Sequence, residues 1–148
     1  MIGVDGAKMV MAGRESTYYL MSNGGVKACG RNNEGQLGDG TREDSNSPVS
    51  VRLPNNVDVR MIGSGPSSQS VFFVADEDTV YAAGANDRHQ LGLSIDDDCV
   101  TRPRLIEGMD VVPFLDNVEK VCSSGTHTLA IVCQIITQTP TSMPTETP

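Results

Sequence analysis

The chain has 148 residues, of which 15 are glycine and 8 are proline, and its formal net charge is −8. None of its apolar stretches approaches the roughly 18 residues that a membrane-spanning helix needs, which argues against membrane insertion. All of the excess acid lies beyond residue 75. This disfavours a nucleic-acid partner, because affinity for a phosphate backbone comes from lysine and arginine.

Short strands are the first elements that the sequence predicts. Residues 8–13 are interpreted as the last strand of a preceding repeat. Apolar runs at 18–21 and 26–29 follow, with a polar turn at 22–25 between them. Runs of this kind between turn clusters, in a chain without a convincing helical apolar period, predict antiparallel β-strands.

A glycine-bracketed turn comes next, at residues 29–38, and it recurs at residues 83–92. Glycine, asparagine and a Gln-Leu-Gly triplet keep their places in both copies. The strands before the turn recur as well, at 72–75 and 80–83. A repeat with a period of about 50 residues indicates a propeller or an array, in which each repeat is one supersecondary unit.

Each recurring residue type in this turn has a structural interpretation. The glycines suit backbone positions that need positive φ or the close approach of a neighbouring strand. We expect Asn32 and Asn86 to bond their own backbone two residues further on. We expect Leu37 and Leu91 to anchor the turn by burial between adjacent sheets.

The repeat units begin at Gly13, Gly65 and Gly125, and a polar loop inside the first two units leads to Pro48 or Pro103. The predicted organisation follows from these starts: the end of a preceding repeat at 1–12, a first repeat at 13–64, a second repeat at 65–124, the start of a third repeat at 125–136 and a Thr/Pro-rich disordered linker or stalk at 137–148.

Two segments resemble the regulator of chromosome condensation repeat. Residues 125–130, Gly-Thr-His-Thr-Leu-Ala, resemble its Gly-x-x-His-Ser/Thr-x-Ala-Leu-like entry, and residues 32–38 match its Asn-x-x-Gly-Gln-Leu-Gly segment. The second copy departs from this pattern, with His89 where glycine is usual. Cys29 and Ala83 stand where the family has tryptophan before glycine.

The resemblance covers roughly residues 4 to 132 and implies an all-β fold. It implies a partial β-propeller made of about two blades of antiparallel four-stranded sheet, taken from a seven-bladed ring. Because propellers close with about four to eight blades, two blades leave open flanks. We therefore expect a fragment of a larger ring, and self-association of several copies is the alternative if the chain is complete.

Residues of the kinds that catalyse reactions or bind metals do not form a recognisable motif. Asp96, Asp97 and Asp98 are consecutive, so their side chains point apart and lack the spacing of a calcium loop. His89 and His127 lie in the turn and entry motifs, and we expect a hydrogen-bonded structural role for His127. We predict no catalytic residue, no cofactor-binding or metal site and no enzymatic activity.

The four cysteines contain no Cys-x-x-Cys pair, which argues against a structural zinc site. If residues 118–122 paired with residues 128–133 as a hairpin, Cys122 and Cys133 could face each other. They could then form a disulfide in an oxidising compartment. The sequence leaves an intracellular and an extracellular location open.

These observations predict a non-enzymatic interaction module that presents propeller loops to a protein partner. The long loops at Asp39 to Ser47 and Ser94 to Thr101 are the candidates for that contact. The family resemblance implies an alternative, a guanine nucleotide exchange factor-like regulator of a small Ran-like GTPase, acting as part of a full ring. A second alternative is a stalked cell-surface or secreted propeller protein, which would use the Thr/Pro-rich segment as its stalk.

Overall fold

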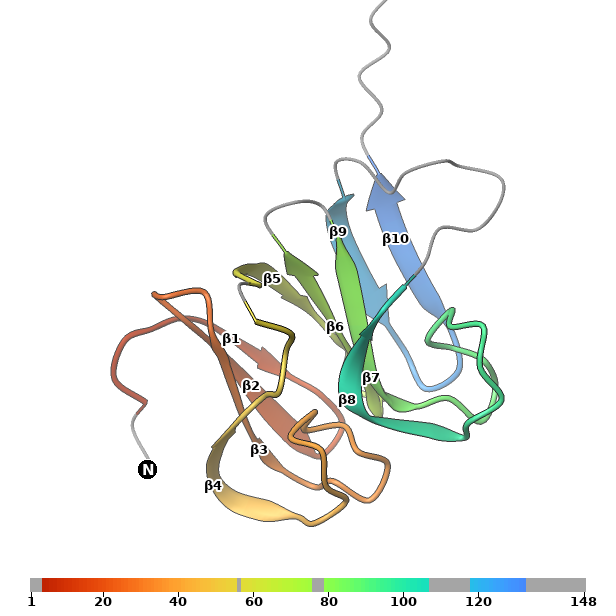
Figure 1. Ribbon diagram of the computed structural model, residues 1–148, viewed down its shortest axis with the longest axis horizontal. Coiled ribbons are helices and arrows are strands. Elements are labelled where there is room, and N and C mark those ends of the chain that lie inside the picture. Colours follow the sequence, from red (N-terminus) through yellow and green to blue (C-terminus); the bar gives the residue numbers. More distant parts are fainter. Residues whose placement is uncertain (1–3, 56, 76–78, 107–117, 133–148) are drawn as a thin grey trace, which may run out of the picture.

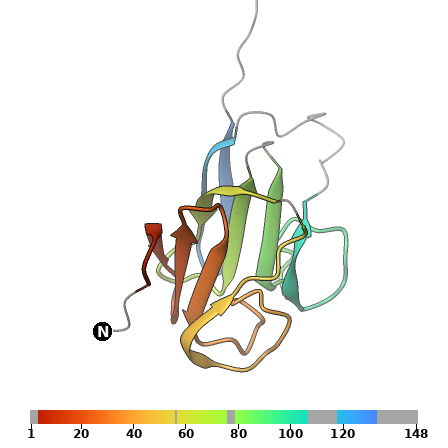
Figure 2. The ribbon, with the colours of Figure 1, turned by 60° about the vertical axis from the view of Figure 1, so that its left-hand side comes forward.

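The computed structural model describes residues 4–55, 57–75, 79–106 and 118–132. In these residues the regular structure consists of β-strands alone, which form two four-stranded antiparallel sheets and one two-stranded hairpin. Figures 1 and 2 show the second sheet lying between the first sheet and the hairpin. The predicted all-β fold with about two four-stranded blades is confirmed.

The first sheet has its strands in sequence order, so each strand pairs with its neighbour along the chain. Its strands are β1 (Ala7–Ala12), β2 (Ser16–Met21), β3 (Val26–Gly30) and β4 (Ser45–Ser50). Side chains of β2 alternate between buried and half-buried. This alternation is the period of a strand with one well-covered face.

The second sheet repeats this order and register. Its strands are β5 (Val59–Gly63), β6 (Ser70–Ala75), β7 (Val80–Ala85) and β8 (Cys99–Leu105). Ser16 pairs with Gly30 in the first sheet as Ser70 pairs with Gly84 in the second. Every residue of β6 is buried, because this sheet is covered on both faces.

The hairpin that the sequence allows near the C-terminal end of the repeats is present, as β9 (Val118–Ser123) and β10 (Thr128–Val132). Its register places Cys122 opposite Leu129. Cys122 is an exposed free thiol, and Cys133, with which the sequence allowed a disulfide, lies outside the described residues.

The strand boundaries shorten the two loops that the sequence predicts. Ser45 already begins β4 and Cys99 already begins β8, so the connections end at Asp44 and Asp98. The prolines that mark these segments, Pro48 and Pro103, lie inside the fourth strands. A fourth strand is the edge of its sheet, and proline, which has no N–H to donate, is tolerated there.

Two apolar cores hold the layers together. The first lies between the two sheets, where Tyr18 and Leu20 of β2 pack with Phe73 of β6. The rings of Tyr18 and Phe73 meet edge to face, with their centroids 6.5 Å apart and their planes at 77°. The second core lies on the other face of the second sheet and contains Phe72 together with Val121 of the hairpin.

The repeat units of the sequence are offset from the sheets. Gly13 lies between β1 and β2, and Gly65 lies between β5 and β6. A unit counted from these glycines therefore begins at the second strand of one sheet and ends with the first strand of the next. The connections after β3 and β7 lie at the same end of their sheets, because both sheets have their antiparallel strands in the same order.

Candidate functional site: the loops after β3 and β7

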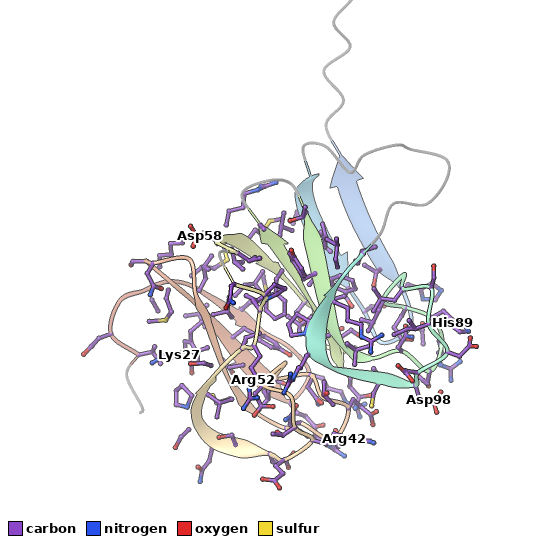
Figure 3. All side chains as sticks on the ribbon, in the orientation of Figure 1. Lys27, Arg42, Arg52, Asp58, His89 and Asp98 are labelled. Atoms are coloured by element: carbon purple, nitrogen blue, oxygen red, sulfur yellow. The ribbon has the colours of Figure 1, made fainter. Side chains whose placement is uncertain are left out.

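The connections between β3 and β4 and between β7 and β8 are the two described surfaces that combine length, charge and exposure. We call residues 31–44 the first loop and residues 86–98 the second loop. Figure 1 shows that both leave the same end of their sheets, where the turn between β9 and β10 also lies. In Figure 3, Arg42 of the first loop and Asp98 of the second are labelled at this end, and Asp58 lies away from it.

A buried asparagine organises the first loop. The Asn32 side chain has no exposed surface, and its Oδ1 accepts a hydrogen bond from the Leu37 N–H at 2.9 Å. Its Nδ2 donates across the loop to the carbonyl oxygens of Thr41 at 3.2 Å and Glu43 at 3.1 Å. The sequence predicted a bond from Asn32 to the backbone two residues further on, and this was wrong. The loop closes around the amide, so its bonds reach the backbone of more distant residues.

The second loop uses the same device. Asn86 Oδ1 accepts from the Leu91 N–H at 3.3 Å, and Asn86 Nδ2 donates to the Asp97 carbonyl at 2.9 Å. The glutamines of the repeated triplet also act alike: Gln36 Oε1 accepts from the Glu34 N–H and Gln90 Oε1 from the Arg88 N–H, each at 2.9 Å. The recurrence of asparagine and glutamine at matching positions was the sequence signal that both loops have the same ordered conformation.

Positive φ recurs at matching positions of the two loops. Gly38 and Gly92 have φ values of 65° and 67°, and Gly35 has φ 73°. The position of Gly35 is taken by His89 in the second loop, with φ 53°. Within the described residues, His89 is the one non-glycine residue with positive φ, so the same turn is retained there with a backbone strain that glycine would avoid.

The leucines of the triplets are buried as predicted. Leu37 belongs to the core between the two sheets, and Leu91 belongs to the core that includes Val121 of the hairpin. Each loop is therefore anchored against the next layer of the stack. Side-chain anchoring together with the buried asparagine keeps the loop backbone fixed relative to its sheet.

The first loop is covered on one side by β8. The Gly40 N–H donates to the Thr101 carbonyl at 2.8 Å. A Cβ placed on Gly35 would lie 2.7 Å from the Thr101 Cα, and one on Gly38 would lie 3.3 Å from the ring of Pro103. Glycine is needed here because the strand of the neighbouring sheet passes directly over the loop.

The outer surfaces of the two loops carry different charges. The second loop exposes Asp87, Arg88 and the three consecutive aspartates. Its ion pairs are long: Arg88 to Asp87 and Arg104 to Asp97 both measure 3.8 Å, between largely exposed side chains. Such pairs contribute little to stability, which leaves the charges available to a partner.

Two polar side chains outside the loops, those of His127 and Tyr19, have local partners. The exposed His127 places Nδ1 2.6 Å from Thr126 Oγ1, a contact between sequence neighbours. Tyr19 Oη lies 3.7 Å from Cys29 Sγ, and this hydrogen bond raises the pKa of Tyr19. Among the residues that the structure describes, no three histidine, cysteine or acidic side chains are grouped so as to hold a metal ion.

Stacked antiparallel four-stranded sheets, repeated along the chain with their loops at one end, define a β-propeller architecture. The family model described as "Regulator of chromosome condensation (RCC1) repeat" matches residues 23–69 and 77–131. The chain belongs to this family. Over the described residues, none of its elements is a helix of the length and apolarity that crossing a membrane requires.

Curated relatives share about a third of the aligned residues. The human probable E3 ubiquitin-protein ligase HERC3 is 32% identical over 123 residues, which cover 83% of this chain and 11% of the ligase. The ultraviolet-B receptor UVR8 of Arabidopsis thaliana is 32% identical over 104 residues, which cover 69% of this chain and 22% of the receptor. The chain thus spans a small part of either protein.

Solved structures share the fold at lower identity. Human WBSCR16 superposes with a TM-score of 0.77 and 22% identity, over 89% of this chain and 32% of that structure. Yeast RCC1 (Prp20), solved bound to Kap60, gives a TM-score of 0.72 and 21% identity over 88% of this chain and 31% of its own. These likenesses confirm the propeller fold.

Proposed function

We propose that the chain is a non-enzymatic interaction module and that the first and second loops present its contact surface to a protein partner. The observation that carries this proposal is the contrast between the inside and the outside of the loops. Inside, Asn32 and Asn86 hold both backbones in the same conformation through equivalent bonds to Leu37 and Leu91. Outside, the exposed residues differ in type and charge.

This contrast is typical of a scaffold that displays variable contact residues on a fixed frame. A rigid loop loses little conformational entropy when a partner binds, so its contacts yield more of their free energy as affinity. The first loop offers both signs of charge, such as Glu34 and Arg42, whose side chains pair at a distance of 4.0 Å. The second loop is mainly acidic and favours a partner with a basic surface, through faster encounter and selection against acidic proteins.

Site-specific photo-crosslinking tests the proposal. A photoreactive phenylalanine analogue is placed at Arg42, Asp98, Asp58 or Lys27 of the full chain, one position at a time, in cells that express it. Arg42 and Asp98 lie at the loop end, whereas Asp58 lies away from it. We expect a discrete crosslinked partner from Arg42 or Asp98, at several times the yield from the other two positions.

A charge-reversed chain supplies the control. Asp98→Lys in the chain that carries the analogue at Arg42, or Arg42→Glu in the chain that carries it at Asp98, should reduce the crosslink with only a small change in the melting temperature, because both side chains are exposed. Partner crosslinks that arise from Asp58 or Lys27 and not from the loops would overturn the proposal.

A nucleotide-release assay distinguishes the exchange-factor alternative from the interaction module. One structure with a TM-score of 0.73, that of Prp20p from Saccharomyces cerevisiae, is titled with its binding properties to Gsp1p and histones. At 21% identity this likeness supports the fold, so exchange activity stays an alternative. It predicts faster release of a fluorescent guanine nucleotide from a Ran-like GTPase, whereas an interaction module leaves that rate unchanged.

A further inference from the structure

The first loop and β8 meet along a contact between the two four-stranded sheets. The Gly40 N–H donates to the Thr101 carbonyl at 2.8 Å, which ties the loop of one sheet to the edge strand of the other. All eight strands of these two sheets are described. Further layers of a propeller pack on the outer faces of the two sheets, so this contact is internal to the described pair.

Two exposed arginines reach this contact from different sheets. Arg52 follows the buried Val51, and its N–H donates to the Gly38 carbonyl at 2.8 Å. Arg102 of β8 precedes Pro103, whose ring lies 3.3 Å from the place of a Cβ on Gly38. Because Arg52 and Pro103 both contact Gly38, the two arginines are held at the same turn of the first loop.

A third exposed arginine, Arg42, lies in the first loop itself, where its Nε donates to the Asn33 carbonyl at 2.6 Å. A Cβ on Gly40 would lie 2.8 Å from Arg102 Nε, so glycine at this position leaves room for the Arg102 guanidinium. We call Arg42, Arg52 and Arg102 the arginine seam. Figure 3 labels Arg42 and Arg52 in the part of the view where the first loop meets β8.

The charges of the arginine seam are barely neutralised within the chain. Among the described residues, no acidic side chain forms an ion pair with Arg52 or Arg102. Arg42 has one acidic partner there, Glu34, at the long distance of 4.0 Å. Guanidinium groups carry five N–H donors each, so most donors of the seam remain available to a ligand.

The carboxylates of the first loop are engaged elsewhere. Asp39 Oδ1 accepts from the Thr41 N–H at 3.0 Å and from Thr41 Oγ1 at 2.8 Å. Asp44 Oδ1 accepts from the Asn32 N–H at 2.7 Å. These two acidic side chains therefore stabilise the loop backbone, and the arginines keep their positive charge on the outer surface.

The surroundings of the arginine seam favour a short anionic ligand over a long one. Guanidinium groups bind carboxylates through paired hydrogen bonds, which makes an acidic peptide a suitable ligand. Asp96, Asp97 and Asp98 immediately precede β8, and the whole chain has a net charge of −8. A nucleic acid that extended beyond the seam would be repelled by these groups, whereas a few consecutive acidic residues would not reach far beyond it.

We propose that the arginine seam binds a short acidic segment of a partner protein, with its carboxylates paired to Arg42, Arg52 and Arg102. The inference rests on the proposed function and assigns a ligand class to the first loop together with β8. The acidic second loop favours a basic surface, so the two loops select oppositely charged parts of a partner. This difference in charge fixes the orientation in which the partner binds.

A labelled acidic peptide tests the proposal. The probe is blocked hexaglutamate with a fluorescent label, titrated against the whole 148-residue chain and followed by fluorescence anisotropy. We expect saturable binding that weakens with added salt, because exposed charges are screened. Failure of hexaglutamate to bind at low salt would overturn the inference.

Substitutions separate the arginine seam from the charge of the whole chain. Arg42→Gln, Arg52→Gln and Arg102→Gln together should weaken binding about tenfold, since each exposed ion pair contributes about twofold. Either Arg52→Gln or Arg102→Gln alone should weaken it about twofold, which provides a test if the triple variant fails to fold.

The matched control removes three positive charges from other strands. Lys8→Gln, Lys27→Gln and Lys120→Gln, on β1, β3 and β9, give the same net charge as the triple arginine variant. This control should weaken binding by less than about twofold, because its charges are remote from the ligand and screened. Equal losses in the two triple variants would show attraction by overall charge and would overturn the inference.

Two further outcomes separate this inference from its alternatives. If a single-stranded DNA oligonucleotide bound more tightly than hexaglutamate and depended on the same three arginines, the ligand class would be wrong. A chain that crosslinks a partner from the loop positions yet binds no hexaglutamate would overturn this inference and leave the proposed function standing. Absence of a crosslinked partner at both loops would count against the proposed function itself.

Discussion

At the residue scale, two buried amides determine the shape of the candidate site. Asn32 and Asn86 are almost without exposed surface, and each connects the start of its loop to residues much further along. A buried amide that satisfies both a donor and several acceptors is costly to replace, because each partner left unpaired keeps its desolvation penalty. The loops owe their fixed form to this chemistry together with the burial of Leu37 and Leu91.

We predict that Asn32→Asp lowers the free energy of unfolding by about 2–3 kcal/mol. The change removes the donors to Thr41 and Glu43 and places a carboxylate beside Asp39, whose Oδ1 lies 3.2 Å from Asn32 Nδ2. Urea denaturation at neutral pH measures the loss. Asn46→Ala, at an exposed position in β4, is the control and should change stability by less than about 0.5 kcal/mol.

Glycine positions in the loops give a second test at this scale. Gly35→Ala should cost about 2–3 kcal/mol, because positive φ is strained for alanine and the new Cβ meets the backbone of Thr101. Gly92→Ala has the same φ strain, but among the described residues the nearest atom to the new Cβ is Ile106 Cγ2 at 3.9 Å, so it should cost only about 1 kcal/mol. Equal losses in thermal or urea melts would contradict the close approach of β8.

The sequence identified the residues that form the loops, but it did not identify most of the contacts that these residues make. The paired Gln-Leu-Gly triplets located both turns, and the burial of Leu37 and Leu91 is as expected. The reach of the asparagine bonds could not be predicted, since it depends on where the loop returns. The cover over Gly35 could not be predicted either, because β8 is distant in sequence and reaches the loop only when the sheets stack.

At the element scale, the two sheets satisfy the same loop carbonyl in different ways. Tyr18 of β2 donates its hydroxyl to the Gln36 carbonyl at 2.9 Å. Its counterpart in β6 is Phe72, which has no hydroxyl, and the Gln90 carbonyl instead accepts from Thr128 Oγ1 of the hairpin at 2.9 Å. The Gln90 carbonyl is thereby tied to the next layer, whereas the Gln36 carbonyl is tied to its own sheet, and the first loop contacts the next layer through the Gly40 N–H instead.

Tyr18 should also make stability depend on alkaline pH. Burial raises the pKa of Tyr18 above its ordinary value of 10, partly opposed by a hydrogen bond with Ser16. The stabilisation from the neutral phenol is therefore complete below about pH 10, the unfolded value, and is lost as pH rises further. Tyr18→Phe should cost about 1 kcal/mol at pH 7, where the Gln36 carbonyl loses its donor.

The difference between the parent chain and Tyr18→Phe should shrink as the pH rises beyond 10, because the parent must then keep its phenol neutral or bury a charge. Urea denaturation at pH 7, 9, 10.5 and 11 follows this convergence. A constant difference across the series would show that the phenol is not coupled to folding.

At the scale of the whole molecule, neighbouring layers contact each other through the turns between the first and second strands of each layer. The Arg14 N–H donates to the Ser68 carbonyl at 3.1 Å, and the Ser68 and Ser123 hydroxyls lie 2.6 Å apart. A Cβ on Gly65 would collide with the Ser123 carbonyl, which explains the glycine that opens the second repeat unit. The entry glycines were recognisable from the sequence, but their partners lie in the next layer and were not.

Stacked layers of this kind couple mainly to their nearest neighbours, so damage to one contact should stay local. Phe73 faces the first sheet and Phe72 faces the hairpin, although they are adjacent in β6. Phe73→Ala should cost about 3–5 kcal/mol and Phe72→Ala a similar amount, as for other buried aromatic residues. The two substitutions should nevertheless destabilise different layers, because the two side chains lie in different cores.

Native-state hydrogen exchange resolves this difference. In Phe73→Ala, amides of β1–β4 should lose the most protection, because their sheet loses its edge-to-face partner for Tyr18. In Phe72→Ala, the loss should concentrate in β9 and β10, which share the second core through Val121. If both variants lowered protection uniformly over all ten strands, the layers would unfold as one cooperative unit and the nearest-neighbour description would be wrong.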